Sequence, residues 1–240
     1  MIFDQSEFDI RCEWGEQGVL HLAPISDAVM IVDVLSFSTC VSIATARGAE
    51  LFPYRGKGDE AGEFARSVGA VLAGRRGESV WSLSPASLLQ LPAGTRLVLP
   101  SPNGSTLTLA TGETPTFAGC LRNARAVAEA AARCGPRIAV IPAGEWWRTD
   151  WSLRPAIEDW LGAGAIIQHL PGSLSPEARL AAEAFRSAAD DIHAVISACS
   201  SGKELIAQGF AEDVALAAAI DADESVPRLV EGAYRRHISQ

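Results

Sequence analysis

The residue types best suited to chemistry stand in turns that follow short apolar runs. Asp33 closes one such run, and strand alternation would place it on the same face as Val29 and Ile31. A buried carboxylate is costly unless it is paired, hydrogen-bonded or bound to a cation. We therefore interpret Asp33 as a metal ligand or catalytic group; the alternative is an aspartate held by backbone N–H groups of the next turn. Ser38 and Thr39 follow with hydroxyl groups that can cap a helix or donate to a ligand.

The second turn lies in the stretch SPNGSTL at 101–107. Asn103 and Gly104 tolerate positive φ, so successive N–H groups can face one concavity and hold an anion. Ser105 follows at the expected start of a helix, where the helix dipole favours negative charge. The alternative is a plain turn, because Asn-Gly is a common turn dipeptide. The stretch lacks the lysine of a Walker phosphate-binding loop.

Two further turns supply charged groups. Arg122 can form a bidentate pair with a phosphate or sulfonate, and Asn123 precedes a helix; the alternative is a surface arginine beside a capping asparagine. Glu158 and Asp159 stand in the first turn of another expected helix, where the dipole stabilises acids in any case. The helical period predicts that Glu158 flanks the buried face and that Asp159 points away from it.

A sheet is needed to bring these turns together. Short apolar runs alternate with Ala-rich helical patterns, which predicts an α/β fold with a mostly parallel sheet and helices on both faces. Ligands of such sheets bind at the carboxyl ends of the strands. The expected strands are 28–35, 49–54, 70–74, 96–100, 137–144 and 193–199. The expected helices are 36–49, 59–70, 105–111, 123–135, 154–170, 175–191, 201–210 and 211–220, with N-terminal signals at Asn123, Pro155, Ser175 and Pro176.

The length of the chain allows one large domain or two small ones. We expect either a division into two α/β halves, 1–125 and 126–240, or one compact domain. Hydrophobic residues make up 48% of the 240 residues, which is enough for a sizeable core. A net charge of −9 argues against nucleic acid as a partner, but it does not exclude a small anionic substrate.

Cysteine usage and the apolar runs indicate the expected compartment. The five cysteines show neither CxxC nor zinc-finger spacing, which is typical of reduced cytosolic thiols. The first residues lack the apolar core of a signal peptide, and no apolar run is long enough for a membrane span. We therefore expect a cytoplasmic protein with no membrane partner.

Five stretches in order carry a resemblance to a known family: VDVLSFSTCVSIATARGA, LVLPSPNGSTLT, GCLRNARAVA, PAGEWW followed by IEDWLGAGAII, and SSGKELIAQGFAEDVALAAAID. Together they resemble the 2-phosphosulfolactate phosphatases of coenzyme M biosynthesis over roughly residues 28–228. Ser36 departs from the family pattern, which has an arginine at this position. The stretch at 74–85 also departs, and it keeps only Gly74, Arg76, Gly77 and the Ser84–Pro85 ending.

The resemblance implies a magnesium-dependent enzyme that hydrolyses 2-phosphosulfolactate to 3-sulfolactate and phosphate. Asp33 would be a Mg²⁺ ligand or the nucleophile, with Glu158 the second candidate for a catalytic or metal-binding role and Asp159 a third metal ligand. The substrate phosphate and its other anionic group would contact Ser38, Thr39, Asn103, Gly104, Ser105, Arg122 and Asn123. Arg75 or Arg76 could restore the charge that Ser36 lacks.

Two other functions stay open at the level of sequence. The departures at Ser36 and at 74–85 also suit a related protein that binds a small anion with lost or altered chemistry. The Trp-rich segment 146–160 suits an interaction surface, and a homodimer formed there is compatible with either function. Trp clusters are common in cores and interfaces.

Overall fold

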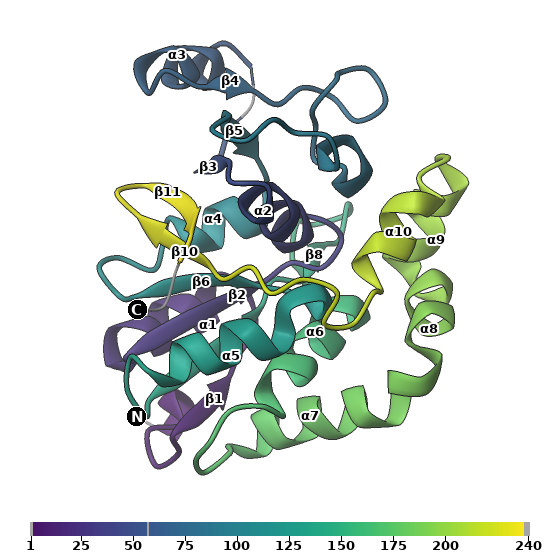
Figure 1. Cartoon of the computed structure of the whole chain (residues 1–240). Coiled ribbons are helices and arrows are strands. Elements are labelled where there is room, and N and C mark those ends of the chain that lie inside the picture. The colour runs from purple at the N-terminus through teal and green to yellow at the C-terminus, as the bar shows by residue number, and fades with distance from the viewer. Residues whose placement is uncertain (1, 57, 238–240) are drawn as a thin grey trace.

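The computed structural model describes residues 2–56 and 58–237, which fold around a nine-stranded sheet (Figure 1). The strand order is β1-β7-β2-β6-β10-β11-β3-β5-β4. The strands are β1 (Ile10–Cys12), β2 (Ala28–Val32), β3 (Glu50–Tyr54), β4 (Val71–Leu72), β5 (Arg96–Pro100), β6 (Thr116–Gly119), β7 (Ile138–Pro142), β10 (Pro227–Val230) and β11 (Ala233–Arg236). A separate two-stranded hairpin consists of β8 (Glu145–Trp146) and β9 (Leu153–Arg154).

The sheet consists of two parallel blocks joined by an antiparallel hairpin. Strands β1, β7, β2 and β6 pair in parallel, as do β3, β5 and β4. The hairpin β10–β11 lies between the blocks and pairs antiparallel with β6 and with β3. Three antiparallel pairings therefore separate the blocks, whose strands run in opposite senses along the ladder. The predicted α/β class with a mostly parallel sheet is confirmed.

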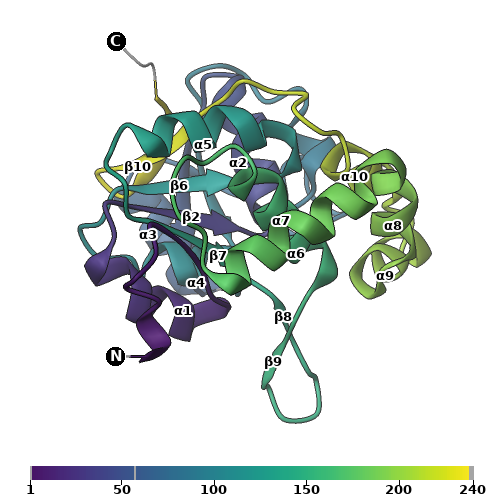
Figure 2. The same cartoon turned by 90° about the horizontal axis from the view of Figure 1, so that it is seen from below.

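Helices cover both faces of the first block. Met30 and Val32 of β2 belong to a core shared with α5 (Ala124–Ala132), α6 (Ile157–Ile167) and α7 (Pro176–Ala188). Val29 and Ile31 point the other way, into a core with α1 (Gly15–Leu22) and α4 (Gly104–Thr108). Figure 2 shows α5, α6 and α7 side by side over the strands. The alternation of β2 follows from the two-residue period of a strand.

Two of the remaining helices pack on the second block, and two of the others contribute buried residues to the core of the first block. Their bounds are α2 (Phe37–Ala46), α3 (Asp59–Ser67), α8 (Ile192–Ala198), α9 (Ser200–Ala207) and α10 (Ala211–Ala217). Helix α2 packs with β3 and β5 in a second core, whereas α3 packs on the opposite face against Phe52 and Val98. Short 3₁₀ turns occur at Ile2–Asp4, Ala23–Ile25, Pro85–Leu88, Leu121–Asn123 and Ala189–Asp191.

Several predicted elements are confirmed and others are wrong. Ser175 caps α7, and its hydroxyl accepts a hydrogen bond from the Ala178 N–H. The strand expected at 193–199 is the helix α8, because a short apolar run carries no decisive period and its buried residues Ile192 and Ile196 lie four apart. The helix expected from residue 154 begins at Ile157, since residues 153–154 pair in the β8–β9 hairpin.

The expected halves share the main sheet. Strand β7, from the second half, lies between β1 and β2 from the first, and the hairpin β10–β11 also lies among strands of the first half. A division near residue 125 stays a prediction. Within the described ranges, no helix is both long and apolar enough to cross a membrane.

Candidate active site

Asp33 stands in the turn between β2 and α2 and is 5% exposed. One carboxylate oxygen accepts a hydrogen bond from the Phe37 N–H at 3.1 Å, and the other accepts one from the Gly104 N–H at 2.9 Å. The side chain of Ser101 forms a further hydrogen bond with it. The start of α2 and the turn after β5 thus hold this carboxylate from two sides.

Ser38 and Thr39 are fully buried in the first turns of α2. The Ser38 hydroxyl donates to the Ile31 carbonyl at 2.9 Å and accepts from the Asp33 N–H at 3.0 Å. The Thr39 hydroxyl donates to the Val34 carbonyl at 2.7 Å. Both groups stabilise the turn that carries Asp33, and this placement gives a substrate no open access to them.

The turn at Asn103–Gly104 binds a carboxylate of the chain itself. The Gly104 N–H, expected to face an external anion, donates to Asp33 instead. A Cβ at position 104 would overlap ring atoms of Phe37, so this close approach requires glycine. The Asn103 side chain lies between Glu145, to which its Nδ2 donates at 2.9 Å, and Trp146, whose indole N–H donates to its Oδ1. Ser105 donates to the Leu99 carbonyl at 3.0 Å.

A cavity of about 250 Å³ opens at these turns. Asp33, Asn103 and Glu145 line it together with residues from distant parts of the chain. The other lining residues are Leu35, Ser36, Arg76, Leu83, Ser101, Pro102, Ser201, Glu204, Leu205 and Gln208. The cavity thus gathers the end of β2, the end of β5, the start of β8 and the helix α9. Among the sequence candidates, Asp33 and Asn103 line it directly.

Two carboxylates of the cavity hold protons more tightly than usual. Burial raises the pKa of Asp33 to about 6; the N–H groups of Phe37 and Gly104 oppose the shift, and the charge of Glu158 adds to it. Burial, reinforced by the charge of Asp33, raises the pKa of Glu145 to about 7. A pair of carboxylates with raised pKa values near neutrality can supply one ionised base and one protonated acid.

Glu158 and Asp159 lie in the first turn of α6 and are 2% and 3% exposed. The Asp159 carboxylate accepts hydrogen bonds from the Val34 N–H at 2.7 Å and the Gly144 N–H at 2.9 Å. The expectation that Asp159 points away from the core is wrong. The first turn of α6 abuts the turns after β2 and β7, whose N–H groups need acceptors, whereas the apolar Ile157 is 46% exposed.

Glu158 and Asp159 interact electrostatically with Asp33. Burial raises the pKa of Asp159, and the negative charges of Glu158 and Asp33 raise it further. Glu158 accepts a weak hydrogen bond from the Cys199 thiol at 3.3 Å. Glu158 and Asp159 therefore lie behind Asp33 rather than among the residues that line the cavity.

Arg122 and Asn123 face another part of the fold. The Asn123 amide accepts from the Cys120 N–H at 2.9 Å and donates to the Ala118 and Ser225 carbonyls. The Arg122 guanidinium donates to the Leu216 carbonyl at 2.9 Å. These contacts fasten the start of α5 to the C-terminal segment, and neither residue lines the cavity at Asp33.

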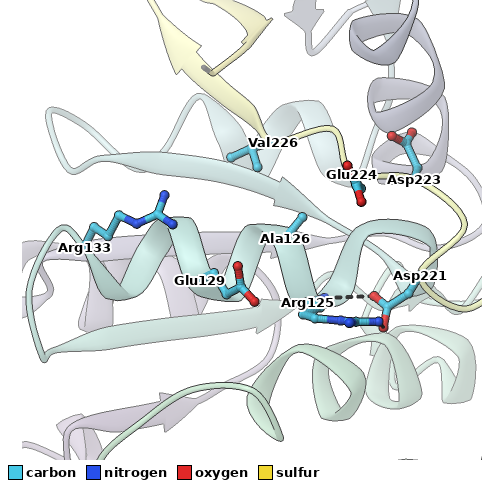
Figure 3. A pocket seen from close by; sticks show the side chains of 8 residues that line it. All are labelled: Arg125, Ala126, Glu129, Arg133, Asp221, Asp223, Glu224 and Val226. Carbon is cyan, nitrogen blue, oxygen red and sulfur yellow. Dashed lines mark hydrogen bonds and ion pairs between the residues drawn. The ribbon is translucent and has the colours of Figure 1, made fainter. Parts of the chain in front are cut away.

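A second hollow, of about 420 Å³, lies beside α5 and the segment before β10 (Figure 3). Arg125, Glu129, Arg133, Asp221, Asp223 and Glu224 are the charged residues that line it. Arg125 pairs with Asp221 at 3.3 Å inside it. None of the candidate residues from the sequence lines this hollow.

The described ranges contain no group of three or more His, Cys, Asp or Glu side chains disposed to hold a metal ion. Magnesium sites usually consist of one or two carboxylates completed by water and substrate phosphate. Asp33 meets this description, because it is a hard oxygen donor at the edge of a cavity and its ionised form is disfavoured by burial and by Glu158. The donor chemistry therefore fits Mg²⁺.

The residue pattern assigned no role to Glu145 and did not favour Arg76 over Arg75. Glu145 follows closely after β7, so its position at the carboxyl end of a parallel strand was an available signal. Arg76 lies in the irregular stretch between β4 and the 3₁₀ turn at Pro85–Leu88, where no periodic pattern predicts its direction. Ser36 was identified from the sequence only as a departure from the family pattern.

A mostly parallel sheet with a polar cavity at the strand ends, lined by two carboxylates of raised pKa, is typical of α/β enzymes. The chain belongs to the 2-phosphosulpholactate phosphatase family, whose profile matches residues 17–232. The resemblance noted in the sequence is thus confirmed.

Individual relatives agree with the family profile. A protein of Methanothermobacter thermautotrophicus named 2-phosphosulfolactate phosphatase is 33% identical over 193 residues, which cover 79% of this chain and 80% of that protein. A probable 2-phosphosulfolactate phosphatase of Carboxydothermus hydrogenoformans is 31% identical over 210 residues, covering 83% of this chain and 85% of the relative.

Proposed function

We propose that this protein is a magnesium-dependent phosphatase that hydrolyses 2-phosphosulfolactate to 3-sulfolactate and phosphate, in coenzyme M biosynthesis. The observation that carries the proposal is the cavity in which Asp33 and Glu145 meet beside Asn103 and Arg76. The family and the names of its relatives indicate the same substrate. The cytoplasmic location expected from the cysteines stays a prediction.

Phosphoryl transfer requires a nucleophile in line with the leaving group and neutralisation of the charge on the phosphoryl oxygens. With a pKa of about 6, Asp33 is mostly ionised at neutral pH. The Asp33 carboxylate either attacks phosphorus itself or would hold the metal ion and leave the attack to water. In the first case the aspartyl phosphate is cleaved by water, which releases phosphate and restores the carboxylate. The N–H groups of Phe37 and Gly104 orient it in both cases.

Glu145 is suited to protonate the leaving group. Its pKa of about 7 leaves it partly protonated at neutral pH, and the Asn103 amide holds its position. When the bond between phosphorus and the substrate oxygen breaks, the alkoxide of sulfolactate takes a proton from Glu145. The ionised Glu145 can then recover this proton from the attacking water.

Asp33 would hold Mg²⁺, and Glu158 behind it adds negative charge that favours the cation. When bound, the ion neutralises phosphoryl charge. Asp159 is less suited as a ligand, because it lies behind Asp33 and is not among the residues that line the cavity. We place the substrate phosphate beside Asn103 and Ser101, which line the cavity, rather than against the buried hydroxyls of Ser38 and Thr39.

Phosphate release from 2-phosphosulfolactate by the purified protein tests this function. We expect turnover with Mg²⁺, and Asp33→Asn should lower kcat by at least about 100-fold. Rapid acid quenching followed by hydroxylaminolysis would detect an aspartyl phosphate and decide between the two roles of Asp33. Unchanged turnover in Asp33→Asn would refute the assignment of this residue, and tight binding without any turnover would favour a binding protein of altered chemistry.

A homodimer through the β8–β9 hairpin is the proposed assembly. Figure 2 shows this hairpin projecting from the body of the molecule. Trp147 and Trp151 lie in the connecting loop and are 52% and 71% exposed. Exposed aromatic rings are typical of protein interfaces. Sedimentation should give a dimer for the native chain and a monomer for the double variant Trp147→Ala, Trp151→Ala; a native monomer would refute the proposal.

A further inference from the structure

The residues that line the cavity supply little positive charge. Among the described residues that line it, Arg76 alone is cationic, whereas Asp33, Glu145 and Glu204 are acids. A substrate with two anionic groups meets net repulsion in such a site unless cations offset it. Mg²⁺ would neutralise the phosphate, which leaves Arg76 as the cationic partner, among the lining residues, for the carboxylate and the sulfonate of the substrate.

Arg76 contacts Ser36, the position at which the family pattern has an arginine. Its Nη2 donates a hydrogen bond to the Ser36 hydroxyl at 3.0 Å. Ser36 is the residue that replaces the expected arginine, and it precedes α2 in the same turn as Asp33. A serine is short enough to leave room for a guanidinium that arrives from another segment. Arg76, which is itself kept from the family pattern, therefore places a guanidinium beside position 36.

The guanidinium is held firmly rather than left to move in solvent. Asp213 of α10 pairs with its Nη1 at 3.0 Å, and the Leu83 carbonyl accepts from its Nη2. The Asp213 side chain is 1% exposed and also accepts from the Ser84 hydroxyl at 2.7 Å and the Ala86 N–H at 2.9 Å. The Phe210 ring lies 5.3 Å from the Arg76 Cζ.

Arg76 still has donors for a ligand. A guanidinium carries five N–H groups, and residues in the described part of the chain accept three hydrogen bonds from Arg76. The side chain keeps 17% of its surface exposed. Because the guanidinium is already oriented, little side-chain entropy is lost when it pairs with an oxyanion.

We propose that Arg76 binds an oxyanion group of the substrate other than the phosphate, either the sulfonate or the carboxylate, and so determines specificity for phosphoesters that carry such a group. Asp213 is the residue that positions it. This inference rests on the proposed phosphatase function and adds the group that recognises the part of the substrate that does not react.

The test compares 2-phosphosulfolactate with propyl phosphate, which has no second anionic group. We expect Arg76→Gln to lower the ratio of kcat/KM values for the two substrates by about tenfold or more, mostly through KM. The matched control is Arg75→Gln, since the Arg75 side chain is 85% exposed, and this variant should keep the native ratio. Adding Ser36→Arg to Arg76→Gln should restore part of the lost discrimination.

Two further measurements keep the outcomes separate. Arg76→Gln leaves Asp213 without its cation, so the double variant Arg76→Gln, Asp213→Asn provides a folded comparison if the single variant unfolds. Calorimetric binding of 3-sulfolactate, which carries no phosphate, tests the contact without turnover. Native hydrolysis with an unchanged ratio in Arg76→Gln overturns this inference alone. If the native protein hydrolyses nothing, weaker 3-sulfolactate binding in Arg76→Gln still supports it, and equal or absent binding overturns it.

Discussion

The Gly104 N–H donates a hydrogen bond to the Asp33 carboxylate across 2.9 Å. This contact joins the turn after β5 to the turn after β2, although the two strands belong to blocks of opposite direction. Twist that accumulates from strand to strand allows the two carboxyl ends to converge. Asp33, the carboxylate with the central role in the proposed chemistry, therefore also links the two blocks of the sheet.

Replacement of Gly104 tests this link. In Gly104→Ala, the new methyl group overlaps the Phe37 ring, so we expect a loss of about 1–3 kcal/mol in the free energy of unfolding. Gly62→Ala is the control, because an added Cβ there lies 3.7 Å from the end of the Arg66 side chain within α3. That variant should gain roughly 0.5–1 kcal/mol. Urea denaturation measures both, and equal stability of Gly104→Ala and the native protein would contradict the close packing.

The pH profile of activity tests the acid–base pair. We expect kcat/KM to rise as Asp33 ionises with a pKa of about 6 and to fall as Glu145 loses its proton with a pKa of about 7. Glu145→Gln should lower kcat by roughly 100-fold or more and remove the fall on the alkaline side. Glu113→Gln, at an exposed position outside the cavity, is the control. An alkaline limb that persists in Glu145→Gln would exclude it as the proton donor.

Folding stability should depend on pH through Asp33. Burial raises its pKa in the folded state from 3.8 to about 6, so the folded protein binds the proton more tightly than the unfolded chain. Stability from this group is therefore present below pH 4 and is lost as the pH rises to about 6. The loss is on the order of 3 kcal/mol. Unfolding in EDTA should show a smaller decrease for Asp33→Asn.

The contribution of Asp27 to folding stability should change with pH in the direction opposite to that of Asp33. Hydrogen bonds from the Arg137 side chain hold the pKa of Asp27 below its usual value. Its contribution to stability should therefore disappear as the pH falls below about 4, and Asp27→Asn should remove this decrease. If Asp33→Asn and Asp27→Asn changed the pH dependence in the same direction, the burial of an Asp33 charge would not be the cause.

Metal dependence has a readout that does not require turnover. Mg²⁺ should raise the melting temperature of the native protein, because binding to the folded state stabilises it by mass action. Asp33→Asn should abolish this increase, and EDTA should lower phosphatase activity. Sodium chloride at equal ionic strength controls for screening of the acidic residues. An increase that survives in Asp33→Asn would place the ion elsewhere.

Substitution of Asn123 separates a structural role from substrate binding. Asn123→Ala removes an amide that forms hydrogen bonds with the Cys120 N–H and with the Ala118 and Ser225 carbonyls. We expect a loss of about 1–3 kcal/mol in unfolding free energy with little change in KM. Arg125→Ala, which breaks an exposed ion pair, should change stability by less than about 1 kcal/mol. A large increase in KM for Asn123→Ala would instead indicate that Asn123 contacts the substrate.

The sequence determined the class of fold and the strand end at which we place the proposed chemistry. The two-residue period in β2 correctly separates Val29 and Ile31 from Met30 and Val32, and it places Asp33 directly after them. The signal at Ser175 also correctly predicts a helix start. These features are local, since strand alternation and capping depend on neighbours within a few residues.

Only the tertiary structure decided which side chains share the cavity. Arg76 meets Ser36 across 40 positions and Asp213 across 137, and no local period encodes such contacts. The burial of Asp159 likewise depends on N–H groups of Val34 and Gly144, because the ends of other strands need acceptors there. The sequence therefore determined where a carboxylate would stand, and the packing of distant segments decided its hydrogen bonds, its pKa and its cationic neighbour.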